Sequence, residues 1–273
     1  MNKNFTKIVK TITQLVALFL LLWNASAQAL VLEDLIANGT LETTLQNKKI
    51  GYYLGSFDPL HKGHEVVAKL PIKQKLCDFV LIYPAWGGDS YKTRADVSLR
   101  LDMLYAVFAT HPKIIVTRLP PKKLQTTLTV PANLSPSVII KEQPQIIVKP
   151  AFVGTSFIGI IGSDTALGLA PNEDAAATFM TGIQIAKKYQ THTLGGCMAL
   201  PVKTFIVAIR AGDDLSLLYG KVRNRKIIAI IDGDSAQAMS STLVKQTLKI
   251  GAAIDLMVSK PVVEIIEKYK LYQ

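Results

Sequence analysis

Two histidines stand three residues apart in the stretch GSFDPLHKGH, which runs from Gly55 to His64 behind an apolar segment. If a helix begins near His61, the rings of His61 and His64 project to one side of its first turn. The dipole and the free N–H groups at a helix N-terminus favour anions. Gly55 and Gly63 would let an anion approach the backbone closely, because glycine has no Cβ. The stretch therefore predicts a phosphate-binding turn.

A second group with the same chemistry stands near the C-terminus. Ser240, Ser241 and Thr242 precede a helical pattern, and Lys245 follows one turn later. Hydroxyls and N–H groups at a helix start bind phosphate oxygens, and a cation one turn on neutralises them. A helix N-cap would by itself explain the hydroxyls, so this group points to phosphate chiefly as the partner of the first.

Strands that alternate with helices are expected to position both groups. Strands are predicted at 48–57, 77–86 and 113–119 and at the starts of 156–170, 202–214 and 226–234, and helices at 63–76, 98–111, 175–188, from about 241, and within 252–273. This alternation indicates a single Rossmann-like α/β domain with a doubly wound parallel sheet. Ligands of such a sheet lie beyond the carboxyl ends of its strands, where GSFDPLHKGH follows the first core strand. Residues 120–150, rich in Pro, Thr and Lys, carry no assigned element.

The composition suits one globular domain with a small anionic ligand. The chain has 273 residues, of which 49% are hydrophobic, and a net charge of +11. The charge is dispersed, without the basic runs and interleaved aromatic residues of a nucleic-acid groove. We therefore expect small phosphorylated ligands rather than nucleic acid. The two cysteines, Cys77 and Cys197, are too few for a disulfide framework, and free buried thiols are expected, although one bridge stays open.

The first 27 residues have the pattern of a secretory signal peptide. Lysines at 3, 7 and 10 lead into an apolar run, Leu15 to Trp23, and then into Ala25-Ser26-Ala27, which fits a small-residue cleavage rule. The run is shorter than the ~20 residues that span a bilayer, so an uncleaved anchor is the second interpretation. The expected organisation is a signal peptide at 1–27, a lead-in at 28–47 and the domain at 48–273, with an exported mature chain that has no membrane span.

The first stretch resembles a family motif. GSFDPLHKGH is similar, position by position, to the G-[ST]-F-[DN]-P-x-H-x-G-H string of the nucleotidylyltransferase superfamily with the (H/T)xGH motif. The run Ser240 to Lys245 is similar to its second motif, S-[ST]-T-x-[IV]-R, with lysine in place of arginine. Lysine still binds phosphate as a point charge but lacks the bidentate fork.

The segments between these motifs resemble the nicotinate/nicotinamide mononucleotide adenylyltransferase branch. YPAWGGDSYKTRADVSLRLDML would supply the cations Lys92 and Arg100, FIGIIGSDTALGL would supply Gly162 and Asp164, and FIVAIRAGDD would supply Arg210. The closing IDLMVSKPVVEIIEKYKLY is also similar. With gaps, the resemblance covers residues 49–272.

The resemblance implies an adenylyl transfer. The 5′-phosphate of a pyridine mononucleotide attacks the α-phosphorus of ATP in line and pyrophosphate leaves, so the protein positions anions and stabilises charge. The residues implied as catalytic are His61, His64, Lys92, Arg100 and Lys245. Those implied as nucleotide-binding are Gly55, Ser56, Phe57, Gly63, Gly162, Asp164, Arg210, Ser240, Ser241 and Thr242. No resident metal is expected, because Mg²⁺ would arrive with ATP, the co-substrate.

Two departures and several alternatives go with this interpretation. Branch members usually have a Thr-containing helix before the FIGIIG strand and a tryptophan after it; residues 120–150 stand in place of the helix, and no tryptophan stands near Leu169. Asp164 as a helix N-cap and Arg210 as a surface charge are the structural alternatives. A related transferase with another phosphorylated acceptor, or an exported nucleotide-binding protein without turnover, is the functional alternative. The sequence leaves nicotinate and nicotinamide mononucleotide both open as acceptors and fixes no oligomeric state.

Overall fold

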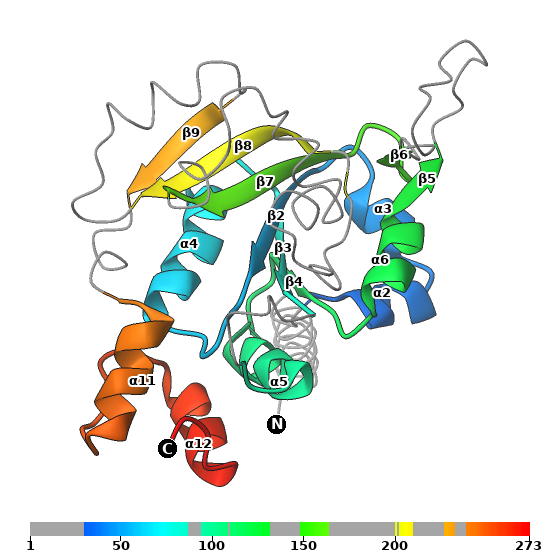
Figure 1. The fold of residues 1–273 in the computed structure, drawn as a ribbon. Helices are drawn as coiled ribbons and strands as arrows, with labels where there is room; N and C mark the ends of the chain where they lie inside the picture. Colours follow the sequence, from blue (N-terminus) through cyan, green and yellow to red (C-terminus); the bar gives the residue numbers. More distant parts are fainter. Residues whose placement is uncertain are drawn as a thin grey trace, which may run out of the picture.

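The fold is built on one parallel β-sheet, shown among its helices in Figure 1. The computed structural model describes residues 30–86, 94–108, 110–131, 148–163, 200, 202–209, 227–232 and 239–273. Within these residues the sheet has seven strands in the order β1-β4-β3-β2-β7-β8-β9, and every pairing in it is parallel. The strands are β1 (Leu30–Val31), β2 (Lys49–Gly55), β3 (Phe79–Pro84), β4 (Ile114–Val116), β7 (Ser156–Gly162), β8 (Val202–Ile209) and β9 (Ile227–Asp232).

Helices cover both faces of this sheet. They are α2 (Leu32–Ala37), α3 (Leu41–Leu45), α4 (Lys62–Lys73), α5 (Val97–Phe108), α6 (Pro121–Leu128), α11 (Ser241–Lys249) and α12 (Lys260–Lys268). In Figure 1, α11 and α12 lie beyond one end of α4, at the lower left. The helices α2, α3 and α6 lie next to one another at the right of the view. A short antiparallel hairpin, β5 (Thr129–Pro131) with β6 (Val148–Pro150), lies beside α6. The doubly wound parallel sheet predicted from the alternation of strands and helices is confirmed.

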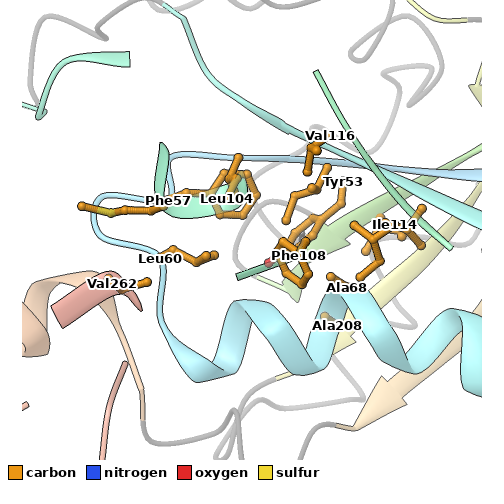
Figure 2. Close-up of a cluster of buried hydrophobic side chains, with 14 of the residues drawn as sticks. Tyr53, Phe57, Leu60, Ala68, Leu104, Phe108, Ile114, Val116, Ala208 and Val262 are labelled. Carbon is orange, nitrogen blue, oxygen red and sulfur yellow. The ribbon is translucent and has the colours of Figure 1, made fainter. Parts of the chain in front are cut away.

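Alternate side chains along each strand feed two separate cores. Tyr53 of β2 packs in a cluster with residues of α4, α5, α11 and α12, whereas Tyr52 packs in a second cluster with residues of α2, α3 and α6. This alternation follows from the two-residue period of a strand. Figure 2 shows the first cluster, in which Phe57 and Leu60 come from the GSFDPLHKGH loop and Leu104 comes from α5. The loop is therefore anchored by its own apolar side chains.

The strand order reverses between β2 and β7. From β2 the chain crosses to β3 and then to β4 on one side, and it later returns to β7, β8 and β9 on the other side. β2 and β7 are paired in register as far as Tyr53 and Ile160, so their carboxyl ends, Gly55 and Gly162, lie at the same edge of the sheet. In doubly wound sheets this reversal opens a crevice in which ligands bind.

The structure adds to two parts of the sequence interpretation. In the segment 28–47, the expected lead-in, β1 pairs with β4, and Leu32 and Leu45 are fully buried. The unassigned region 120–150 contains α6, which carries Thr126 and Thr127. A Thr-containing helix thus precedes β7 after all. Its sequence signal was weak because its first turn carries no acidic residue.

Some predictions concern residues outside those described. The signal peptide at 1–27, the helix at 175–188 and Cys197 are among them. Cys77 is a free, buried thiol, and burial raises its pKa to about 12. No helix within the described ranges is both long and apolar enough to cross a membrane.

Candidate active site

The two histidines stack on each other at the start of α4. His61 is the N-cap residue, and its backbone N–H donates to Nδ1 of His64 at 3.3 Å. The ring centroids lie 3.6 Å apart, with an interplanar angle of 26°. Because Nδ1 of neutral His64 accepts a hydrogen bond, its proton is placed on Nε2, where it can donate to an anion. The turn therefore presents two imidazoles together with the N-terminus of a helix.

The loop before these histidines folds around Phe57. This residue has a left-handed backbone, with φ of 48°, and its side chain is fully buried. The ring meets His64 edge-on at 5.0 Å between centroids. A Cβ on Gly55 would lie 2.7 Å from the Phe57 ring, so glycine is required here by the phenyl ring as well as by any ligand. Phe57, implied as nucleotide-binding, can contact a nucleotide through its backbone, because its ring is buried and packs against His64.

Arg100, implied as a phosphate-facing cation, binds backbone carbonyls within the protein. Its guanidinium donates to the backbone carbonyls of Ser56 at 2.8 Å, Ala85 at 2.8 Å and Ala95 at 3.0 Å, and the residue is 2% exposed. Burial lowers the pKa of Arg100, and the charge of Asp58 raises it; an arginine nevertheless stays protonated in proteins. Arg100 thus ties the loop after β2 to the loop after β3 and to the start of α5.

Arg94 is a cation that the sequence analysis missed. Its Nε donates to the hydroxyl of Ser56 at 3.1 Å, which places a half-buried guanidinium beside the GSFDPLHKGH loop. The signal was present, because Arg94 stands between Lys92 and Arg100 in the same basic segment. Lys92 itself lies outside the described residues.

Asp58 is the second residue that was missed, and it joins three distant segments. One carboxylate oxygen, Oδ1, accepts the backbone N–H of Ala95 at 2.9 Å and the hydroxyl of Tyr272 at 2.7 Å. The other, Oδ2, forms an ion pair with Lys245. Asp58 is 3% exposed, so its charge is compensated inside the protein, as a buried carboxylate requires.

Lys245, implied as a ligand of the β/γ-phosphates, has a partner within the protein. Its ammonium is paired with Asp58 and lies 4.8 Å from the centroid of the Tyr272 ring. An ammonium has three donors, so the pairing with Asp58 holds the group in place and leaves donors for a second anion.

The N-terminus of α11 lies against the histidine loop. The Ser241 hydroxyl donates to the carbonyl of Pro59 at 3.0 Å across 182 residues of sequence. The Ser240 hydroxyl accepts the backbone N–H of Leu243 at 3.1 Å and so acts as an N-cap, whereas Thr242 is exposed. Two helix N-termini, those of α4 and α11, thus meet at one loop.

Of the remaining implied residues, Gly63 and Gly162 are described by the structure, whereas Asp164 and Arg210 are not. Gly63 lies buried in the first turn of α4, and half-buried Gly162 ends β7 beside the end of β2. Asp164 and Arg210, which follow the ends of β7 and β8, lie outside the described residues. No group of three His, Cys, Asp or Glu side chains gathers into a metal site among the described residues.

Comparison with known proteins gives one consistent set of relatives. The chain is 26% identical over 232 residues to a Synechococcus sp. (strain JA-3-3Ab) protein named "Probable nicotinate-nucleotide adenylyltransferase", a match that covers 83% of this chain and 96% of the relative. It is 28% identical over 226 residues to a Hydrogenobaculum sp. (strain Y04AAS1) protein of the same name, covering 82% of this chain and 97% of the relative. No family model matches the sequence.

The fold has a solved counterpart. The structure of Plasmodium falciparum nicotinic acid mononucleotide adenylyltransferase complexed with NaAD superposes with a TM-score of 0.51 at 18% identity, covering 82% of this chain and 97% of that one. At this identity the match supports the fold alone. Together with the two relatives that span it, it confirms what the motifs predicted: over most of its length, the chain is similar to nicotinate-nucleotide adenylyltransferases.

Proposed function

We propose that the protein transfers the adenylyl group of ATP to the 5′-phosphate of a pyridine mononucleotide. A phosphate oxygen of the mononucleotide forms a bond to the α-phosphorus of ATP, the bond between the α-phosphorus and its bridging oxygen to the β-phosphorus breaks, and pyrophosphate leaves. The relatives that span the chain support nicotinate mononucleotide as the acceptor, since both carry its adenylyltransferase name.

One observation carries this proposal: the N-termini of α4 and α11 meet at the reversal point of the sheet. The Ser241–Pro59 hydrogen bond and the Lys245–Asp58 ion pair hold them together. Each N-terminus favours anions through its dipole. Two of them at one loop suit a polyphosphate rather than a single phosphate.

The described side chains have distinct tasks in this reaction. His61 and His64 stabilise charge on the transferring phosphate, because two positioned donors at a developing charge lower the barrier by electrostatic stabilisation. Lys245 and exposed Thr242 lie at the α11 end, where they bind the β- and γ-phosphates. Arg94 adds positive charge beside Ser56, and Arg100 keeps the loop in shape.

Magnesium enters this site with ATP. Asp58, the acidic residue of the loop, is occupied by Ala95, Lys245 and Tyr272, and no acidic cluster accompanies it in the described part of the chain. The ion would therefore be held by ATP phosphates and water, which is common for Mg²⁺, and would neutralise the leaving pyrophosphate.

The test is pyrophosphate release by the purified protein with ATP and each mononucleotide, together with His64→Ala. We expect turnover with nicotinate mononucleotide, weaker turnover with nicotinamide mononucleotide, and a loss of more than tenfold in kcat in the variant, which corresponds to about 1.4 kcal/mol of barrier.

The matched control is His111→Ala. His111 stands three residues before β4, near the amino ends of the strands and so at the opposite edge of the sheet from the loop. This variant should keep wild-type activity. Activity of His64→Ala within tenfold of the wild type would contradict the role of His64, and ATP binding without turnover on any acceptor would contradict the proposed activity.

We also propose, from the sequence pattern, that residues 1–27 are a cleaved signal peptide and that the mature protein is exported. Peptide mapping of the mature N-terminus tests this, with Gln28 as the expected first residue. A mature chain that keeps Lys3 to Lys10 would contradict it.

A further inference from the structure

The C-terminal tail reaches the histidine loop through the hydroxyl of Tyr272. Tyr272 is the penultimate residue, and its hydroxyl donates to Oδ1 of Asp58 at 2.7 Å, across 214 residues of sequence. The side chain is half-buried. Burial, and then the bond to Asp58, raise the pKa of Tyr272, so the hydroxyl remains a protonated donor at any physiological pH.

The tail is held in an unfavourable backbone conformation at this point. Lys270 and Tyr272 have φ values of 48° and 65°, a region that is unfavourable for residues with side chains and persists where surrounding contacts impose it. α12 packs against α5 just before the tail, and Val262 and Ile266 are buried in the same core cluster as Leu104. The contacts of the tail thus determine where Tyr272 lies.

Tyr272 contacts Lys245 as well as Asp58. The Lys245 ammonium lies 4.8 Å from the centroid of the Tyr272 ring. The hydroxyl of the same tyrosine donates to Asp58, which is the ion-pair partner of Lys245. The ring attracts the ammonium through its quadrupole, and the hydroxyl keeps Asp58 oriented. Lysine has a flexible four-carbon stem and no planar fork, so its position depends on such contacts more than that of an arginine would.

We propose that Tyr272 is a positioning residue for ATP binding: through Asp58 and its own ring, it sets the place of the Lys245 ammonium at the N-terminus of α11. This inference rests on the proposed function for the identity of the ligand. Tyr272 thereby contributes to binding of the β- and γ-phosphates of ATP without touching the substrate itself.

The test compares Tyr272→Phe with the wild type. Phenylalanine keeps the ring under Lys245 and removes the hydroxyl alone. We expect the KM for ATP, and the Kd for Mg·ATP measured by calorimetry without mononucleotide, to rise three- to tenfold, which is less than a direct hydrogen bond to a charged group is worth because the hydroxyl acts through Lys245. The KM for the mononucleotide and kcat should stay within twofold of the wild type.

The double variant Tyr272→Phe/Lys245→Met separates positioning from general stability. If Tyr272 acts through Lys245, the double variant should bind Mg·ATP within twofold of Lys245→Met alone, because positions that act as one unit are non-additive. The matched control is Tyr269→Phe, a residue of the same tail that is 44% exposed and whose ring faces Lys268. It should match the wild type throughout.

Failure of this inference and failure of the proposed function give different results. Turnover by the wild type with an unchanged KM and Kd in Tyr272→Phe would overturn the role of Tyr272 and leave the function intact. Binding of Mg·ATP without turnover would overturn the function, whereas a Kd raised in Tyr272→Phe would still support the positioning role. Equal increases in both KM values with a lower melting temperature would overturn it in favour of a purely structural role.

Discussion

Arg100→Lys is the most informative single change outside the histidine pair. Arg100 reaches three backbone carbonyls, on Ser56, Ala85 and Ala95, at 2.8 to 3.0 Å. The carbonyls belong to three segments, and the planar fork of a guanidinium can serve all three at once. Lysine keeps the charge but brings one compact ammonium, which can serve one of them well.

The expected loss of folding free energy follows from the two carbonyls that would lose their hydrogen-bond donor. A hydrogen bond to a charged group contributes about 1.5–3 kcal/mol, so losing two gives roughly 3–6 kcal/mol before the structure relaxes. Loop movement and entry of water would recover part of this, and we expect a net loss of about 2–4 kcal/mol. For a chain of this size, that lowers the melting temperature by roughly 5–15 °C.

The assay is thermal unfolding in parallel with ATP kinetics. The matched control is Arg118→Lys: Arg118 is an exposed arginine paired with Asp102, and such surface pairs are worth ~1 kcal/mol or less. A melting temperature of Arg100→Lys within 2 °C of the wild type, combined with a tenfold or larger rise in the KM for ATP, would refute the bridging role and return Arg100 to phosphate binding.

Two further predictions concern the core. In a Cys197→Ser background, where Cys77 is the remaining thiol of the chain, the native protein should resist alkylation at pH 8, because burial raises the pKa of Cys77 to about 12; labelling as fast as in urea would contradict this. Gly159→Ala should destabilise the protein by about 1–3 kcal/mol in urea unfolding, since the added Cβ would lie 2.6 Å from the buried ring of Phe205; an unchanged midpoint would show that the ring can move.

The elements that carry the site could be predicted from local patterns. Apolar runs in 48–57 and 77–86 correspond to β2 and β3, and the helical period of 98–111 corresponds to α5. These are short-range properties of the chain. The strand β1 in the segment 28–47 could not be predicted, because it has two residues, too few for a period to show, and becomes a strand by pairing with β4.

The histidine pair was predictable for the same local reason, whereas the partners of the charged residues were not. His61 and His64 share one turn, so their spacing brings them together. Asp58 meets Lys245 and Tyr272 across 187 and 214 residues, and no local pattern shows which distant side chain will reach a buried carboxylate. Arg100 and Lys245 were accordingly expected to face the phosphates directly.

The sequence by itself determined the parallel sheet, the loop that follows its first core strand and the residue types at two helix N-termini, because strand and helix periods and glycine placement act over a few residues. The tertiary structure alone decided that these N-termini share one loop, that Arg100 binds backbone carbonyls, and that Asp58 joins Lys245 to the C-terminal tail. A buried charge must be compensated by whatever donors the folded chain brings within reach, and that depends on the packing of the whole domain.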